Sequence, residues 1–166
     1  MGLDMEIRHY TENGDRDFIY MRKVNWIRNY FANNLDNFED NGTTTIPKAK
    51  FKELLDLMKQ LINETAVKKI FPVYKKSLDI DCGELSRKSE AMIDEFVANG
   101  GEEYERFKEK ADELLPTCSG FFFGSIEYDS WYISELLGYY IRLKNLYNSV
   151  TDVEWENGDV FYWEWY

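Results

Sequence analysis

Apolar and polar residues alternate at the start of the chain and then recur with helical spacing along most of its length. Leu3, Met5 and Ile7 alternate with charged residues, and this period of two predicts a short, half-buried strand. Residues 11–15 are rich in Asn, Gly and Asp, which predicts a turn after that strand. The chain is therefore expected to open with a strand that lies partly on a core.

The next two apolar patterns have the spacing of amphipathic helices. Residues 17–35 carry apolar side chains at intervals of four, three and four, which predicts one helix. Asn41, Gly42 and three threonines predict a loop, and Pro47 suits the first position of a second helix. The stripe of the first helix is Tyr20, Val24, Ile27 and Phe31, and that of the second is Phe51, Leu54, Leu55, Met58, Leu61 and Ile62.

The middle of the chain predicts more helix with one ambiguous stretch. Residues 65–83 have a weak pattern that fits either extended chain or a short helix interrupted at Pro72. Residues 85–97 suit a helix closed by the following Asn-Gly-Gly. Residues 104–115 suit another that ends before a proline.

The C-terminal third predicts two strands around a long helix. Residues 120–124, with three phenylalanines between glycines, favour a buried strand. Asp129 is a candidate cap for the last long helix, and residues 159–166 form an aromatic run that favours a final strand. The predicted fold is α+β, with about five helices on a small, mainly antiparallel sheet of about three short strands. One domain, residues 1–166, is expected.

Composition supports a folded, acidic protein of the cytoplasm. The 166 residues are 44% hydrophobic and 17% aromatic, and the formal net charge is −11. Such a surface repels nucleic acid and anionic lipid and attracts basic partners. No run approaches the roughly 18 apolar residues of a membrane span, and the N-terminus lacks a signal-peptide pattern. Cys82 and Cys118 stand far apart, which favours reduced thiols.

No metal or cofactor site is predicted. One histidine and two distant cysteines cannot supply the four close ligands of a structural zinc site. Asp79, Asp81 and Glu90 occupy positions one, three and twelve of a calcium-loop pattern. That loop requires glycine at its sixth position, where this chain has Glu84. The segment is more simply a solvated acidic turn.

The chain carries no recognisable catalytic motif, so an enzyme is disfavoured. Cys118, Ser119 and Ser125 flank the phenylalanine run, and His9 is the only imidazole available as a base. A nucleophile and its base must lie within hydrogen-bond reach, which a sequence does not show. Serines beside glycines are more often turn residues, and a lone histidine in a strand is more often structural.

One candidate ligand pocket centres on the first helix. Arg22 with Trp26, or Arg22 with Asn29, would share a helix face able to hold an anion or a flat ring. The alternative is a solvated face whose tryptophan a neighbour half covers. The residues expected to converge on this pocket are Asp4, Arg22, Lys23, Asn25, Trp26, Ser119, Ser125, Tyr128 and Asp129.

A candidate partner-binding surface lies at the C-terminus. No basic residue follows Lys144, while acidic and tryptophan residues alternate there. Acidic groups around aromatic anchors suit docking onto an arginine- or lysine-rich groove. The alternative is a closing strand whose aromatic residues belong to the core. The surface would comprise Asp152, Glu154, Trp155, Glu156, Asp159, Trp163, Glu164 and Trp165.

Three segments resemble a family of small bacteriophage and prophage proteins. They are the opening MGLDM, the helix with Arg22, Lys23 and Asn25, and LLPTCSGFFFGSIEYDSWY at residues 114–132. In that family a similar opening, an arginine-lysine-asparagine helix and an LPT-x-SGFFFGS-x-x-YD segment occur in the same order. The likeness covers about the first 35 residues and residues 114–147. Glu6 and Cys118 depart from the pattern of the family, which weakens the hypothesis that the function depends on cysteine chemistry.

The resemblance implies a phage accessory gene, and many such genes counter host defence. Together with the acidic charge, it predicts an inhibitor of a CRISPR or restriction complex in the host cytoplasm, acting by a partly DNA-mimicking surface. The partner would be a host protein with a basic surface, such as a nuclease or CRISPR effector, with no direct nucleic acid or membrane contact. A homodimer is left open. The alternative is a small-molecule binder or enzyme that uses the pocket for a nucleotide or other anion.

Overall fold

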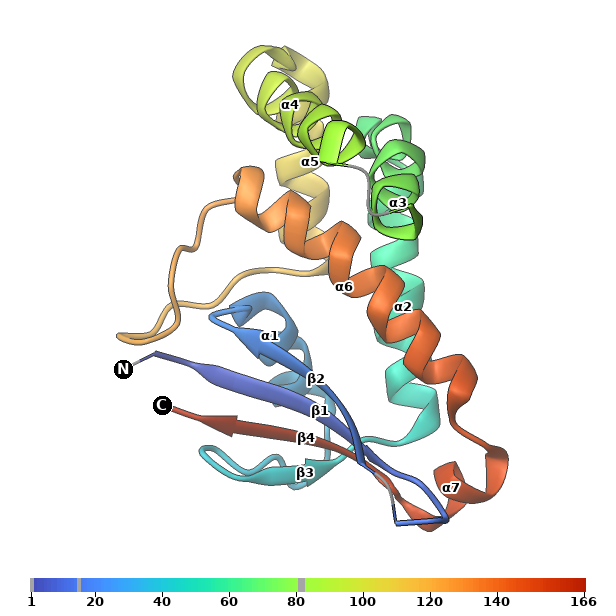
Figure 1. The fold of residues 1–166 in the computed structure, drawn as a ribbon. Coiled ribbons are helices and arrows are strands. Elements are labelled where there is room, and N and C mark those ends of the chain that lie inside the picture. Colours follow the sequence, from blue (N-terminus) through green and yellow to red (C-terminus); the bar gives the residue numbers. More distant parts are fainter. Residues whose placement is uncertain (1, 15, 81–82) are drawn as a thin grey trace. The chain divides into compact units, whose positions relative to one another are not determined.

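The computed structural model describes residues 2–14, 16–80 and 83–166 (Figure 1). Two compact units make up the chain. The boundary between them falls within two helices, α2 (Lys48–Asn63) and α6 (Ser130–Ser149). The expectation of a single domain stays a prediction. Unit 1 comprises Met1–Leu55, Leu115–Ile126 and Arg142–Tyr166, and unit 2 comprises Asp56–Leu114 and Glu127–Ile141.

Unit 1 contains an antiparallel sheet in which the two ends of the chain are neighbours. Its strands are β1 (Asp4–Tyr10), β2 (Arg16–Arg22), β3 (Thr43–Thr45) and β4 (Val160–Trp165). The order is β2-β1-β4-β3, so β1 pairs with both β2 and β4 (Figure 1). The predictions of an opening strand and a closing strand are confirmed.

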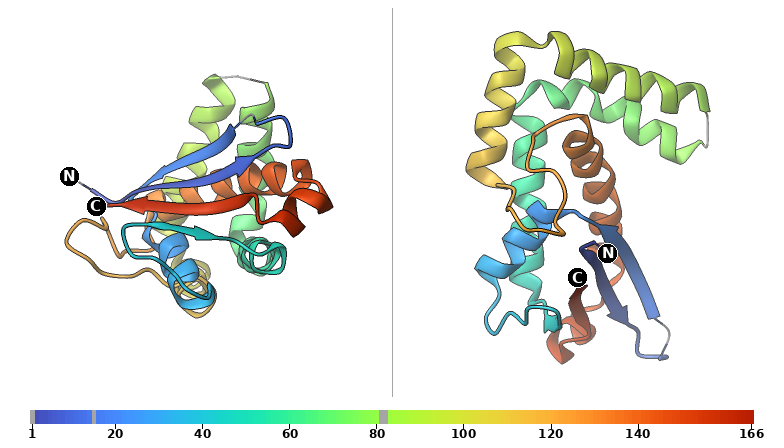
Figure 2. Two further views of the ribbon diagram at one scale, coloured as in Figure 1. Left: turned by 90° about the horizontal axis from the view of Figure 1, so that it is seen from below. Right: turned by 90° about the vertical axis from the view of Figure 1, so that its left-hand side faces the viewer.

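Alternation along the strands places apolar side chains on one face of this sheet. Met5, Ile7 and Tyr162 are fully buried, and Phe31 of α1 (Asn25–Asn34) packs on Tyr162 with ring centroids 4.9 Å apart. Within unit 1, the helices lie on this side of the sheet (Figure 2). No described element of unit 1 covers the opposite side, where Phe18, Tyr20 and Trp165 are exposed. Helix α7 (Asp152–Asn157), which was not predicted, precedes β4.

Three segments of unit 1 differ from the expectations. Residues 17–35 do not form one helix, because 16–22 form strand β2 and the helix begins at Asn25. Pairing with β1 imposes a period of two there, with Ile19 and Met21 buried and their neighbours exposed. Residues 120–124 form a turn rather than a strand, and the expected loop at 43–45 is strand β3.

Unit 2 is helical. The helix ending before the proline is confirmed as α5 (Gly101–Leu114), and the one before it as α4 (Gly83–Asn99). The ambiguous stretch forms a 3₁₀ turn η1 (Ala66–Lys69) and helix α3 (Phe71–Asp79). Pro72 lies in the first turn of α3, where its missing N–H costs nothing.

Helix α6 has the predicted cap. Asp129 Oδ1 accepts hydrogen bonds from the N–H groups of Trp131 and Tyr132, at 3.0 and 3.1 Å. The described residues thus form seven α-helices and four strands, more than the five and three expected, and the mixed helix-and-sheet class is confirmed. No helix among them combines the length and apolarity that crossing a bilayer requires.

Candidate functional site

The uncovered side of the sheet carries a dense set of aromatic side chains. Trp165 is 59% exposed, Phe18 50% and Tyr20 44%. These fractions are high for large apolar residues, and contiguous exposed apolar surface marks interaction sites. We call this side the aromatic face. It comprises Tyr10, Phe18, Tyr20, Phe161, Trp163 and Trp165, together with Asp4, Glu6, Arg8, Arg16 and Arg22.

Arginines on the aromatic face lie over its rings. Arg8 Cζ lies 4.6 Å from the Trp163 ring centroid, and Arg16 Cζ lies 5.1 Å from that of Phe18. Arg8 Nε also pairs with Glu6 Oε2 at 2.6 Å. Because its acidic groups are matched by arginines, the face lacks the strong negative charge of the whole chain. Tryptophan, tyrosine and arginine are the residue types that dominate protein-binding hot spots.

Helix α1 holds the 115–126 loop through one buried asparagine. Asn25 Nδ2 donates to Phe123 O at 3.1 Å and to Ser125 O at 2.7 Å, and its Oδ1 accepts from Cys118 N at 3.3 Å. Three backbone groups of the loop thus share one side chain. The loop presents Phe121 to solvent with 95% of its surface exposed. The expected buried strand is replaced by a loop whose conformation an amide fixes.

A buried ion cluster lies beside this loop. Glu164 is 0% exposed, its Oε2 lies 3.1 Å from Arg28 Nε, and it accepts a 2.6 Å hydrogen bond from the Tyr162 hydroxyl. Arg28 also pairs with Asp40 and lies over the Phe123 ring, with Cζ 4.5 Å from the centroid. Burial raises the pKa of Glu164, against the opposing effects of Tyr162 and Arg28. The cluster ties α1, β4 and the loop together.

The reactive groups considered from the sequence do not form a nucleophile–base pair. Burial raises the pKa of the Cys118 thiol, so the protonated form predominates near neutral pH. That thiol donates to Asn25 O at 3.3 Å. The His9 ring is buried, with Nε2 3.1 Å from Glu154 Oε2. Ser119 is exposed on the loop. The Cys118 thiol and the His9 ring therefore contact different residues.

Three residues of the predicted partner-binding surface are buried, which corrects their expected role. Glu154 accepts hydrogen bonds from the N–H groups of Thr151 at 2.9 Å and Glu12 at 3.2 Å. The Thr151 N–H is the main cause that lowers the pKa of Glu154. Trp155 packs into the core of unit 1, and Glu164 belongs to the ion cluster. None of these side chains is available to a partner.

The other residues of that surface divide between two places. Trp163 and Trp165 belong to the aromatic face, Trp163 half-buried and Trp165 exposed. Asp152 is exposed on α7, where its Oδ1 lies 2.6 Å from Lys48 Nζ. Glu156 is exposed on the same helix and Asp159 is half-buried before β4. Of the predicted set, therefore, only Trp163 and Trp165 lie together on the aromatic face.

The structure brings together some residues of the predicted ligand pocket. The Asp4 Oδ1 to Arg22 Nε distance is 3.9 Å, on the aromatic face. Asn25 reaches Ser125 as described, and a Cβ at Gly124 would lie 3.1 Å from Lys23 Cβ. Trp26 is buried. Two pocket residues belong to unit 2, where Tyr128 donates to Asp112 and Asp129 caps α6.

Sequence reasoning missed Glu164 as a core residue and Phe18 as a surface residue. Alternation along β4 would have placed Glu164, whereas placing Phe18 requires the pairing of β2 with β1. Glu164 shares its parity with buried Val160 and Tyr162, while Trp163 and Trp165 have the other parity. Arg28 gave no such signal, because its partners lie far away in the sequence.

The described residues contain no group of three His, Cys, Asp or Glu side chains that could hold a metal ion. In the calcium-loop pattern, Asp81 lies outside the described residues. Gly83 and Glu84 begin helix α4, so the second part of the pattern is helical.

No protein-family model matches the chain, and neither a curated protein nor a solved structure matches it. The resemblance to phage proteins therefore stays a prediction.

Proposed function

We propose that the chain is a phage-encoded accessory protein that binds a nucleic-acid-handling host complex, of the CRISPR or restriction type, and blocks it. The observation that carries this proposal is the aromatic face, with Phe18, Tyr20, Trp163 and Trp165 on one uncovered side of a sheet. An isolated exposed aromatic residue is ordinary, but a contiguous set with stacked arginines has the composition of a binding hot spot.

Charge has a separate role in this proposal. Acidic residues outnumber basic ones in both units. A partner whose basic groove normally holds nucleic acid would be attracted to such a surface over a long range. Long-range attraction raises the association rate, while close apolar and arginine contacts set the dissociation rate. The acidic surface thus partly mimics DNA in steering, and the aromatic face holds the complex.

The test captures host proteins on the immobilised chain and identifies them by mass spectrometry at low and high salt. A captured nuclease is then purified, and its inhibition and binding kinetics are measured. Trp165→Ala is expected to weaken the Kd about 30-fold, the loss typical of a tryptophan hot spot. Between about 50 and 500 mM salt, the association rate is expected to fall about tenfold and the dissociation rate to change little.

Trp131→Ala is the matched control, because Trp131 is an exposed tryptophan of α6 outside the aromatic face. It should leave the Kd unchanged. The proposal fails if no nucleic-acid-handling protein is captured and inhibited, or if Trp165→Ala and Trp131→Ala bind equally well. An association rate independent of salt would contradict the steering role of the acidic surface.

A small-molecule pocket for an anion remains a second proposal. It is favoured by Lys23, which has a left-handed backbone (φ 59) and lies beside Gly2 and Gly124. Unusual backbone conformations of this kind concentrate at binding sites. A thermal-shift screen with nucleotides, including cyclic ones, is expected to give a stabilisation of several degrees that Arg22→Ala abolishes. No shift across the panel would exclude these ligands.

A further inference from the structure

Strand β2 is the edge of the sheet on one side. In the order β2-β1-β4-β3 it pairs with β1, and no other described strand lies beside it. The Lys23 N–H donates to Leu3 O at 2.8 Å, so Lys23 and Leu3 form a hydrogen-bonded pair between the two segments. Because bonding residues alternate along an antiparallel strand, the odd-numbered residues of β2 bond toward β1. The backbone N–H and C=O groups of Phe18 and Tyr20 therefore point away from the sheet.

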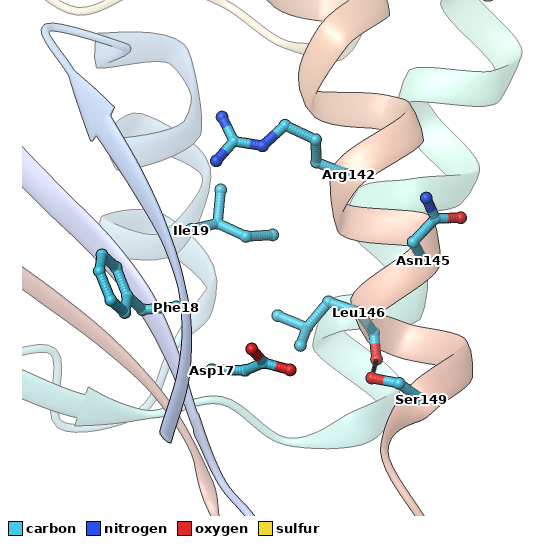
Figure 3. A pocket seen from close by; sticks show the side chains of 7 residues that line it. All are labelled: Asp17, Phe18, Ile19, Arg142, Asn145, Leu146 and Ser149. Carbon is cyan, nitrogen blue, oxygen red and sulfur yellow. Dashed lines mark hydrogen bonds between the residues drawn. The ribbon is translucent and has the colours of Figure 1, made fainter. Parts of the chain in front are cut away.

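A groove of about 400 Å³ runs between this edge and α6 (Figure 3). All its lining residues belong to unit 1. Figure 3 shows Ile19 and Leu146 pointing into its middle, the Asp17 carboxylate at one end and the Arg142 guanidinium at the other. The lining residues are Asp17, Phe18, Ile19, Arg142, Asn145, Leu146 and Ser149.

We infer that this groove binds an extended peptide segment of a partner protein, which adds a strand to the sheet beside β2. Backbone groups at a sheet edge supply main-chain hydrogen bonds to such a peptide, and pockets beside the edge select alternate side chains. Both requirements meet here, since the outward backbone of Phe18 adjoins the groove. The inference does not rest on the proposed function, because it uses the backbone of β2 and the side chains on its helix side, whereas the aromatic face uses side chains on the other side of the sheet.

The lining residues define the chemistry of the peptide. Asp17 and Ile19 point to the helix side of β2, two residues apart, as alternate positions of a strand do. Side chains directly opposite each other on neighbouring strands stabilise the pairing when they carry opposite charges or are both apolar. The peptide should therefore carry a basic residue opposite Asp17 and, two positions away, an apolar residue opposite Ile19. An acidic residue beyond the apolar one would meet Arg142.

The test uses a displayed library of random decapeptides selected against the full chain. Enriched peptides are expected to share a basic and an apolar residue two positions apart. A synthetic version of the best peptide is then titrated, and amide hydrogen exchange is followed by NMR. Binding should slow the exchange of the Phe18 and Tyr20 amides. Asp17→Lys, an exposed site, should shift the selected peptides from a basic to an acidic residue.

Two substitutions at Phe18 isolate the backbone contribution. Proline removes the N–H that points away from β1, so the β1–β2 ladder is kept. Threonine removes the same ring but keeps the N–H. Phe18→Pro should bind the peptide about tenfold more weakly than Phe18→Thr, the effect of one hydrogen bond, with circular dichroism and thermal melting verifying both folds.

Three results would overturn the inference. One is the absence of any enriched peptide, and another is binding that leaves the Phe18 and Tyr20 amides unprotected. The third is a dimer in analytical ultracentrifugation that Phe18→Pro dissociates, because the edge would then belong to a second copy of the chain.

Discussion

Replacing Asn25 with leucine should lower the free energy of unfolding by about 3 kcal/mol, because it removes one side chain that serves three backbone groups. The amide donates to Phe123 O and Ser125 O and accepts from Cys118 N. Leucine has nearly the same volume and no polar atom, so these groups would lose their partners. Urea denaturation measures the loss. Chymotrypsin cleavage within the 115–126 loop should become faster in the native protein, since the loop is no longer held.

Asn33→Leu provides the matched control on the same helix. Asn33 is exposed, and its Nδ2 donates to Asn29 O at 2.7 Å within α1. The expected change is within about 0.5 kcal/mol, as for most surface substitutions. Equal losses in Asn25→Leu and Asn33→Leu would show that the bonds to the loop contribute nothing to stability, and an unchanged cleavage rate would show that other contacts hold the loop.

Local patterns predicted correctly those elements whose structure follows mainly from their own residues. Helix α2 follows from its stripe of apolar residues, and strand β4 from its aromatic run. Helix spacing failed at residues 16–22, because pairing with β1 is a contact between segments that the spacing does not encode. Tyr20, Val24, Ile27 and Phe31 fall on a helical stripe only by accident: Tyr20 is exposed on β2, while Ile27 and Phe31 are core residues of α1.

The candidate site shows the same limit. The tryptophans of β4 were foreseen as anchors, but their face is completed by Phe18 and Tyr20 of β2, a strand that was predicted as helix. The three phenylalanines at 121–123 suggested a core strand. Their actual conformation depends on Asn25, roughly a hundred positions earlier in the chain. In both cases the residue types indicated that the segment has a role. Where its side chains lie depends on tertiary contacts, which a local pattern does not show.

Arg28→Met should destabilise the protein at pH 7 by about 3–5 kcal/mol, because it leaves the buried Glu164 carboxylate without its cation. The Oε2 atom would keep the Tyr162 hydroxyl as a donor, while Arg28 Nε, now 3.1 Å away, would be gone. Burial already raises the pKa of Glu164, and losing Arg28 raises it further. A carboxyl whose pKa is raised on folding takes up its proton in the folded state at a higher pH than in the unfolded state.

The destabilisation should therefore shrink as the pH is lowered from 7 toward 5, since protonation removes the buried charge. Adding Glu164→Leu to Arg28→Met should recover most of the stability at pH 7, because both buried charges are then replaced by apolar groups. The double-mutant cycle compares the unsubstituted protein, Arg28→Met, Glu164→Leu and the double variant, each measured by urea denaturation at both pH values. Lys48→Met, which breaks the exposed pair with Asp152, should leave the denaturation midpoint unchanged. If the double variant is as unstable as Arg28→Met at pH 7, the cluster stabilises the fold through contacts other than the neutralisation of Glu164.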